Sequence, residues 1–281
     1  MAQESRGEKR GYLHEDFRLF HIRDRRALEL DYHYHEFDKI VVFLSGKVTY
    51  LMEGKSYFLA PYDILLVSRD QIHRPVIDTS EPYERVVLWM NTSFLAENSF
   101  EDGDLFRCFK LARERGFALL RLEANERFAL MRCLKETEDA LSSKEFAHDL
   151  LARVNFLRFL IELNRVAYGD QTSLKTDAYR SDPRLNDVIA YINANLDGDL
   201  SLDALCAKFF ISKSHLMHRF KELAGCTAHG YIRQKRLLRA SELIRAGATV
   251  SEACARSGFG DYSAFLKAFK SMFGCVPSEL G

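Results

Sequence analysis

The chain has 281 residues, a length that fits two domains better than one. Forty basic and forty acidic residues cancel, so the overall charge excludes no class of partner. No apolar signal-peptide core and no run of about 18 apolar residues is present, and the six cysteines show no CxxC spacing. These features argue against a membrane protein and a disulfide scaffold, and they predict a cytoplasmic protein with reduced thiols.

The first half of the chain predicts an antiparallel β-barrel over residues 10–95. Five short stretches rich in β-branched and aromatic residues follow one another between residues 39 and 90: KIVVFL, KVTYLM, SYFLA, DILLV and YERVVLWM. Turn sequences such as SGK and EGK separate them. Several short strands at this spacing are typical of a barrel or jelly roll.

Three histidines form the candidate site of this half. His33 and His35 alternate along one extended segment, so both imidazoles point to one face, and His73 can join them from a facing strand. Lys39 follows closely, and its positive charge disfavours a metal cation. We predict an effector pocket of His33, His35, Lys39 and His73 with no metal and no cofactor. If Lys39 points inward, it favours an anionic or hydroxyl-rich ligand. Metal binding and a purely structural role of the histidines are the alternatives.

Residues 100–168 change to a helical pattern with an apolar period near 3.6, as in AHDLLARVNFLRFLIELNRVAYG. One broad apolar face of this second helix consists of Leu150, Val154, Leu157, Leu160 and Ile161. We predict that part of this face covers the barrel and that part holds a homodimer together. The polar stretch 169–183, GDQTSLKTDAYRSDP, is predicted to be the linker to a C-terminal domain at 184–281.

The last hundred residues contain an internal repeat. FKELAGC at 220–226 returns 49 residues later as FKSMFGC at 269–275. Self-similarity at a fixed offset usually means a duplicated structural unit. The segment 204–276 carries twelve Lys or Arg against four Asp or Glu, a local net charge of +8. Such an asymmetry favours a polyanionic partner.

Each copy of the repeat predicts two short helices around a turn. Polar residues that can cap a helix N-terminus stand at the four expected starts, Ser201, Ser212, Thr249 and Asp261. The stretch from Thr249 to Glu252 has the capping-box form, and Gly258 ends the helix that follows. Helix, short turn and helix is the helix-turn-helix pattern, so the C-terminal domain is predicted to be an all-α double helix-turn-helix.

The second helix of each copy has one apolar and one polar face. The predicted inner residues are Leu216, Phe220 and Leu223 in one copy and Phe265, Phe269 and Met272 in the other; the predicted outer residues are Ser214, His218 and Lys221, and Ser263, Lys267 and Lys270. A helix between the copies, residues 228–246, would span about 28 Å. The two recognition helices would then lie about 34 Å apart, one turn of B-DNA, and enter successive major grooves. An ordinary amphipathic surface helix is the alternative for each copy.

The segment from about residue 184 to 278 resembles the DNA-binding domain of the AraC/XylS family of bacterial transcription regulators. The stretch ACARSGFGDYSAFLKAFKSMFGCVPSEL carries the resemblance, with Gly-Phe in the turn, the Phe-Lys pair and Gly-x-x-Pro. The resemblance implies base contacts from Ser214, Met217, His218, Tyr262, Ser263 and Lys267. Lys221 and Lys270 lie further round the same faces and are predicted to contact phosphates. The chain departs from the family by lacking the Tyr-Arg that often follows Pro-Ser.

Residues 33–75, from HYHEFDKIVVFLSGKVTY to DQIHRP, resemble the cupin-type sensor domain common at the front of this regulator family. The three histidines occupy places where enzymatic cupins carry metal ligands. Those cupins also need a carboxylate a few residues after the second histidine, and here the following residues are EFDK. The resemblance therefore implies a cupin-like jelly roll that senses an effector rather than a metal enzyme.

We therefore predict an α+β multidomain protein that is a ligand-responsive transcription regulator. Its expected partners are double-stranded DNA, a small-molecule effector, RNA polymerase and a second copy of the chain. Its target genes are predicted to serve the use of metabolites such as carbohydrates. A cupin enzyme fused to a DNA-binding module is one alternative, which tight metal with turnover would favour. A constitutive DNA-binding protein with a dimerising barrel is the other, which effector-independent DNA affinity would favour.

Overall fold

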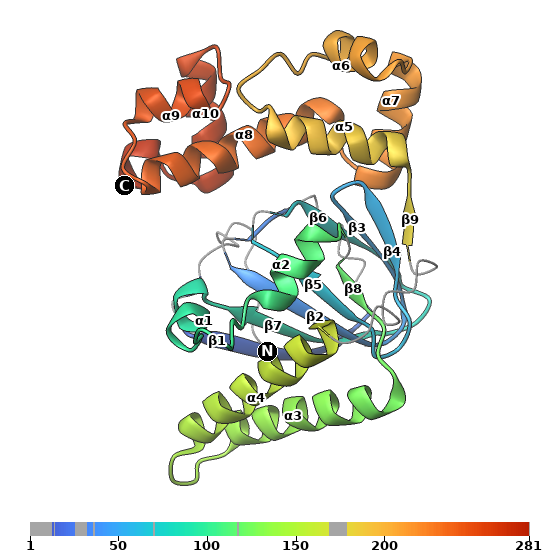
Figure 1. The fold of residues 1–281 in the computed structure, drawn as a ribbon, viewed down its shortest axis with the longest axis vertical. Helices are drawn as coiled ribbons and strands as arrows, with labels where there is room; N and C mark the ends of the chain where they lie inside the picture. Colours follow the sequence, from blue (N-terminus) through green and yellow to red (C-terminus); the bar gives the residue numbers. More distant parts are fainter. Residues whose placement is uncertain are drawn as a thin grey trace.

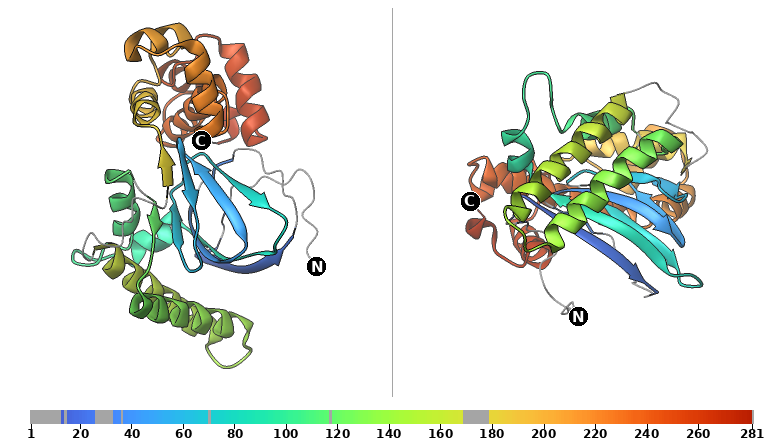
Figure 2. Two further views of the ribbon diagram at one scale, coloured as in Figure 1. Left: turned by 90° about the vertical axis from the view of Figure 1, so that its right-hand side faces the viewer. Right: turned by 90° about the horizontal axis from the view of Figure 1, so that it is seen from below.

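The computed structural model describes residues 13, 15–25, 33–35, 37–69, 71–116, 118–168 and 179–280. A β-barrel with attached helices forms the lower part in Figure 1, and a helical domain sits above it. The left view of Figure 2 shows the same division from the side. The predicted fold class, a barrel domain followed by an all-α helix-turn-helix domain, is confirmed.

Two antiparallel sheets form the barrel. One has the order β1 (Phe17–Asp24), β7 (Tyr83–Met90), β2 (Asp38–Ser45), β5 (Ile64–Val67) and β8 (Leu119–Leu120); the other has the order β6 (His73–Asp78), β3 (Lys47–Met52), β4 (Lys55–Phe58) and β9 (Tyr179–Ser181). The five predicted strands are β2, β3, β4, β5 and β7. Their alternating side chains divide between two cores, because successive residues of a strand point to opposite faces.

Four strands in the described part of the chain were not predicted from the sequence: β1, β6, β8 and β9. The most instructive is β6, which contains Pro75 opposite Tyr50 of β3. Proline cannot donate a ladder hydrogen bond, but β6 is the edge of its sheet, where this loss is tolerated. Strand β9 comes from the predicted linker and pairs with β4, so the chain re-enters the sheet just before the C-terminal domain. Linker residues 169–178 lie outside the described part.

The barrel interior and the outer face of its larger sheet are packed separately. Inside, Val41, Phe43 and Leu65 pack against Tyr50 and Tyr57 of the opposite sheet. Outside, the sheet is covered by the helices α1 (Thr92–Glu97), α2 (Arg107–Glu114), α3 (Ala124–Ser142) and α4 (His148–Tyr168). These helices close one side of the barrel and leave the other end to the C-terminal domain.

Helix α4 divides the broad apolar face that the sequence predicted. Leu160 is fully buried against the sheet, together with Phe156 and Phe159, which the prediction did not include. Leu157 is half-buried. Leu150, Val154 and Ile161, by contrast, are exposed on the outer side of the helix. The barrel therefore takes a face centred on the phenylalanines, and an apolar strip stays uncovered within this chain.

The C-terminal domain contains the predicted pair of helix-turn-helix units. Its elements are α5 (Pro183–Ala194), α6 (Leu202–Phe209), α7 (Lys213–Arg219), a π-helical turn η3 (Phe220–Ala224), α8 (Ala228–Arg245), α9 (Val250–Arg256), α10 (Tyr262–Phe273) and a 3-10 turn η4 (Pro277–Glu279). All four predicted N-caps accept a backbone hydrogen bond: Ser201, Ser212, Thr249 and Asp261. The capping box of Thr249 and Glu252 is also present.

Helix α8 supports both units. Its first part, with Tyr231 and Ile232, belongs to a core formed with α5, α6 and α7, which we call the first core. Its last part, with Leu243 and Ile244, belongs to a core formed with α9 and α10, the second core. One continuous helix therefore joins the two units, as the spacing of the repeat predicted (Figure 1).

Candidate DNA-binding face and effector cluster

The second helix of each unit, α7 and α10, has the predicted division into faces. The inner residues Leu216, Phe220, Phe265 and Phe269 are at most 1% exposed. The eight predicted DNA-contacting residues are exposed: Ser214, Met217, His218, Lys221, Tyr262, Ser263, Lys267 and Lys270. The structure therefore exposes each set of four on the surface of its own unit, with Lys221 on the η3 turn that follows α7.

Ion pairs within the first unit modify this face. His218 Nε2 lies 3.8 Å from Glu222 Oε2, and the same carboxylate accepts from Arg219 Nη1 at 2.5 Å. Arg219 also donates to Asp182 at the start of α5. Glu222 therefore places a carboxylate close to the imidazole of His218, beyond hydrogen-bond distance.

The turns of the two units differ by one residue, and the repeat offset concealed this. In the second unit Gly258 adopts a left-handed φ of +86° after α9. In the first unit Phe210 takes the left-handed position after α6, with φ of +53°, and its side chain is 91% exposed. Ile211 and Phe259 then make equivalent backbone bonds, to the carbonyls of Cys206 and Cys254. An aromatic residue thus stands where glycine is favoured.

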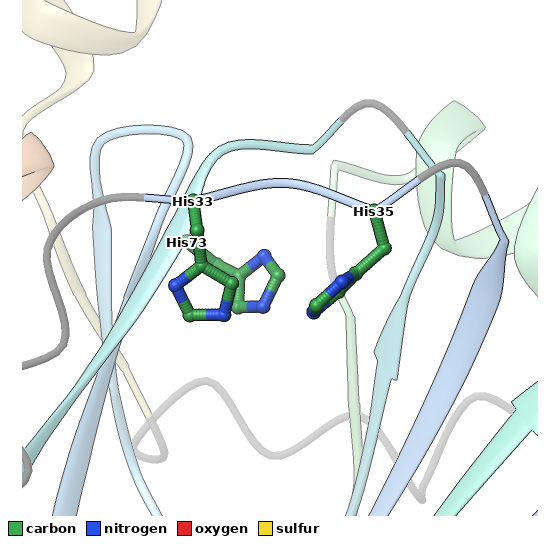
Figure 3. A group of neighbouring side chains, drawn as sticks. All are labelled: His33, His35 and His73. Atoms are coloured by element: carbon green, nitrogen blue, oxygen red, sulfur yellow. The ribbon is translucent and has the colours of Figure 1, made fainter. Parts of the chain in front are cut away.

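The predicted effector residues converge inside the barrel. His33, His35 and His73 each offer a ring nitrogen, and these atoms lie within 4.8 Å of one another. Figure 3 shows the three rings gathered below the segment that carries His33 and His35. His33 and His73 exchange backbone hydrogen bonds of 3.2 and 3.1 Å, which fixes the two segments side by side. We call His33, His35, Lys39 and His73 the histidine cluster.

Lys39 points inward, which strand alternation alone could not decide. Its Nζ donates to His73 Nε2 at 2.7 Å and lies 3.3 Å from His35 Nε2. The Nδ1 of His73 donates to the carbonyl of Gln71 at 2.9 Å, so Nε2 of this ring is the acceptor. The lysine amine therefore occupies the lone pair of His73 Nε2 and lies next to Nε2 of His35, two of the three nitrogens that a metal ion would need.

Burial shapes the charges of the histidine cluster. Burial, and secondarily the charge of Arg85, lowers the pKa of Lys39 from 10.5 to about 7. Burial, followed by the charge of Lys39, holds the pKa of His73 well below its usual value. Both shifts favour the neutral forms, because a charge in this interior loses its hydration. A bound anion would reverse the shift of Lys39.

Two further polar side chains reach this interior from β7, and the sequence prediction did not include them. Arg85 forms an ion pair with Asp24 at 3.3 Å and stacks over the ring of Tyr83. Trp89 is the register partner of Lys39, and its Nε1 is buried without a hydrogen-bond partner in the described part of the chain. The signal was the alternation in YERVVLWM, which places Arg85 and Trp89 on one face.

A β-barrel joined to two helix-turn-helix units is the architecture of a DNA-binding regulator with a sensor domain. The family model of the AraC-like ligand binding domain matches residues 19–160, and that of a helix-turn-helix domain matches residues 205–281. The chain belongs to the AraC family of transcription regulators. No helix among the described residues is both long and apolar enough to cross a membrane.

Curated relatives are similar over most of the chain. The HTH-type transcriptional activator RhaR of Pectobacterium atrosepticum is 24% identical over 257 residues, 88% of this chain and 84% of that protein. The activator RhaS of Salmonella heidelberg is 23% identical over 254 residues, 88% of this chain and 86% of that protein. The solved structure of ToxT from Vibrio cholerae O395 covers 94% of this chain and 96% of that chain, with 16% identity and a TM-score of 0.37.

Proposed function

We propose that this regulator binds a small effector at the histidine cluster and contacts an operator through α7 and α10. The observation that carries the proposal is the pair of matched outer faces, each polar or basic and each exposed, on two helices that one continuous helix joins. The names of RhaR and RhaS as transcriptional activators support a role at promoters. A promoter activator of this kind would work next to RNA polymerase.

Base contacts and phosphate contacts give different signatures. Loss of His218 should relax the sequence preference in one half of the operator, and loss of Lys267 should relax it in the other half. Each loss should lower the free-energy preference for the correct base by about 1–3 kcal/mol. Loss of Lys221 or Lys270 should weaken binding to all sequences alike and lower the slope of log K against log salt by about 1. Alanine substitutions tested on DNA selected with the parent chain measure both effects. Lys144→Ala, on the exposed turn between α3 and α4, is the matched control.

If the His218→Ala and Lys267→Ala variants retain the parent's preference at every position, the assigned faces are wrong. If only the salt slope changes, α7 and α10 follow the backbone without reading bases.

The effector that fits the histidine cluster carries a carboxylate or several hydroxyls. Lys39 supplies a buried amine that a bound anion would keep protonated, and the indole Nε1–H of Trp89 supplies a second donor on the same face of the sheet. Isothermal titration of the full chain with matched neutral sugars and sugar acids tests this chemistry. Lys39→Met should abolish binding of the acid.

A metal would give a different result in the same samples. Because Lys39 already bonds to two imidazoles, protein purified without chelator should hold much less than one equivalent of Fe, Mn or Zn. A full equivalent that disappears in the His73→Ala variant would establish a metal site and revive the cupin-enzyme alternative.

We further propose that the chain forms a homodimer through the exposed strip of α4. Leu150, Leu151, Val154 and Ile161 are 61%, 54%, 52% and 43% exposed on one helix. Two linked DNA-binding modules gain effective concentration on a double site, by about 10²–10⁴ in affinity. Val154→Glu is a sharper test than Leu157→Glu, because Leu157 also packs on the barrel.

Sedimentation of the full chain should show a dimer for the parent and for Lys144→Glu, and a monomer for Val154→Glu. A parent that sediments as a monomer at tens of micromolar, about the concentration at which a weak dimer still forms, would refute the interface.

A further inference from the structure

Each segment that carries histidines of the cluster also contributes a residue to one of the two helix-turn-helix cores. Tyr34, between His33 and His35, packs with the second core, and its ring centroid lies 6.1 Å from that of Phe273 in α10. Ile72 precedes His73, is 2% exposed, and belongs to the first core. Neighbouring residues of an extended chain point to opposite sides. The histidines therefore face the barrel interior while Tyr34 and Ile72 face the DNA-binding domain.

The turn between β3 and β4 strengthens the contact with the first unit. Glu53, in this turn, accepts a hydrogen bond from the backbone N of Ile72 at 2.9 Å. Its carboxylate also lies 2.7 Å from Lys235 Nζ and accepts from the hydroxyl of Tyr231, and both of these residues are on α8. Burial, followed by the negative charge of Glu53, raises the pKa of Tyr231, which keeps the phenol protonated as a donor.

The close approach at this turn depends on a glycine. Gly54 has a φ of +78°, and a Cβ placed on it would lie 2.3 Å from Cδ1 of Ile189 in α5. The backbone of the barrel turn thus packs directly on the side chain of Ile189 in the first unit.

The two contacts are connected behind the histidine cluster. The backbone hydrogen bonds between His33 and His73 join the segment that carries Tyr34 to the segment that carries Ile72. A displacement of either histidine therefore moves the residues that hold both helix-turn-helix units. Because α8 belongs to both cores, the two contacts together set how the units lie relative to the barrel and to each other.

We propose that segments 33–35 and 71–73 couple the histidine cluster to the two helix-turn-helix units, with Tyr34 holding the second unit and Ile72 with Glu53 holding the first. This coupling rests on the proposed function of the cluster as the effector site. A ligand that moves the imidazoles also shifts Tyr34 and Ile72, which lie on the opposite face of the same two segments. The fit of α7 and α10 to successive grooves changes with them. Tyr34, Ile72 and Glu53 are positioning residues and contact neither effector nor DNA.

The coupling can be measured without a known effector or operator. Hydrogen exchange of the full chain, followed by mass spectrometry, reports how firmly each unit is held. The two reporter peptides are the first part of α8, around Tyr231 and Ile232 in the first core, and α10 in the second core. Tyr34→Ala should speed exchange in α10 by about fivefold or more, a typical coupling, and leave the α8 peptide unchanged. Glu53→Gln should do the reverse. Tyr34→Phe, which keeps the ring contact, should behave like the parent, as should Val76→Ala on the exposed face of β6.

The decisive comparison perturbs the cluster itself. Lys39→Met removes the amine that bonds to His35 and His73 and touches neither contact with the DNA-binding domain. Introduced into the parent, Lys39→Met should change hydrogen exchange in both α8 and α10. Introduced into the Tyr34→Ala variant, it should change hydrogen exchange in α8 alone. Unchanged exchange in both helices in the Lys39→Met variant would overturn the coupling. Equal changes in both helices when Tyr34 is absent would overturn the role of Tyr34.

The coupling and the effector proposal fail separately in these experiments. If the cluster binds no sugar acid but Lys39→Met still changes hydrogen exchange in α8 and α10, the proposed ligand is refuted and the coupling is supported. A cluster that binds a sugar acid but leaves α8 and α10 unchanged supports the ligand site and refutes the coupling.

Discussion

The buried amine of Lys39 predicts an unusual dependence of barrel stability on pH. Its pKa falls from 10.5 to about 7 on folding, because burial removes its hydration and Arg85 adds a like charge. Between these two values the unfolded chain holds a proton that the folded chain has lost. Raising the pH through this window therefore favours the folded state. At about 1.4 kcal/mol for each pH unit, the complete difference corresponds to about 5 kcal/mol.

The measurable part lies between pH 7 and 9. With half of Lys39 already neutral at pH 7, the free energy of unfolding should rise by about 2 kcal/mol by pH 9 from this residue alone. The histidines contribute little to the change, because their usual pKa lies below the window. Lys39→Met removes the titration, so the variant should be more stable than the parent at pH 7, and its advantage should shrink by about 2 kcal/mol at pH 9.

The single tryptophan provides the assay. Trp89 is the sole tryptophan of the chain, and its ring lies beside Phe37 and 6.0 Å from that of His35. Urea unfolding followed by its fluorescence therefore reports the barrel and leaves out the C-terminal domain. Lys144 is a surface lysine far from the cluster, and the Lys144→Met variant should differ from the parent in free energy of unfolding by an amount that does not vary with pH. A Lys39→Met difference that is equally constant from pH 7 to 9 would show that the amine is hydrated, and the charge assignment of the cluster would fail.

Three further substitutions test the packing of the C-terminal domain. Gly54→Ala should separate the barrel turn from Ile189, which faster hydrogen exchange in α5 would reveal, because the new Cβ has a clash and an unfavourable φ; unchanged exchange would contradict the close approach. Phe210→Gly should raise the free energy of unfolding by about 1 kcal/mol, and with it the thermal midpoint, because glycine adopts the left-handed φ without strain and no core residue is lost. A lower thermal midpoint would mean that the exposed ring makes a stabilising contact. Thr249→Ala should lower the free energy of unfolding by about 1 kcal/mol, because the helix cap shared with Glu252 is lost. Urea unfolding followed by far-UV circular dichroism measures this change, and an unchanged free energy would show that the cap is redundant.

The helices of the C-terminal domain could be predicted from sequence because their signals are local. An N-cap such as Ser212 or Asp261 lies within three residues of the amide that it binds, and the period of 3.6 separates inner from outer residues within one helix. The repeat supplied each signal twice. Only the one-residue difference between the turns, which puts Phe210 in the left-handed position, escaped the comparison, because a fixed offset cannot represent a deletion.

The barrel strands were predictable where apolar residues dominate and unpredictable where they do not. Strand β6 carries His73 and Pro75, and only its place at the sheet edge makes the proline acceptable. Strand β9 has three residues, and it exists because β4 offers an unpaired edge to a segment that is distant in sequence. Such pairings depend on tertiary contacts, which no window of the sequence contains.

The sequence by itself determined the two-domain plan, the faces of α7 and α10, and the identity of the histidines that could meet. Only the tertiary structure decided that Lys39 points inward, because strand alternation fixes relative faces and leaves open which face the core will take. Only the tertiary structure placed Tyr34 and Ile72 in the two helix-turn-helix cores. Each of these contacts joins parts of the chain more than a hundred residues apart, and the free energy that selects them comes from apolar burial, which is not directional along the sequence.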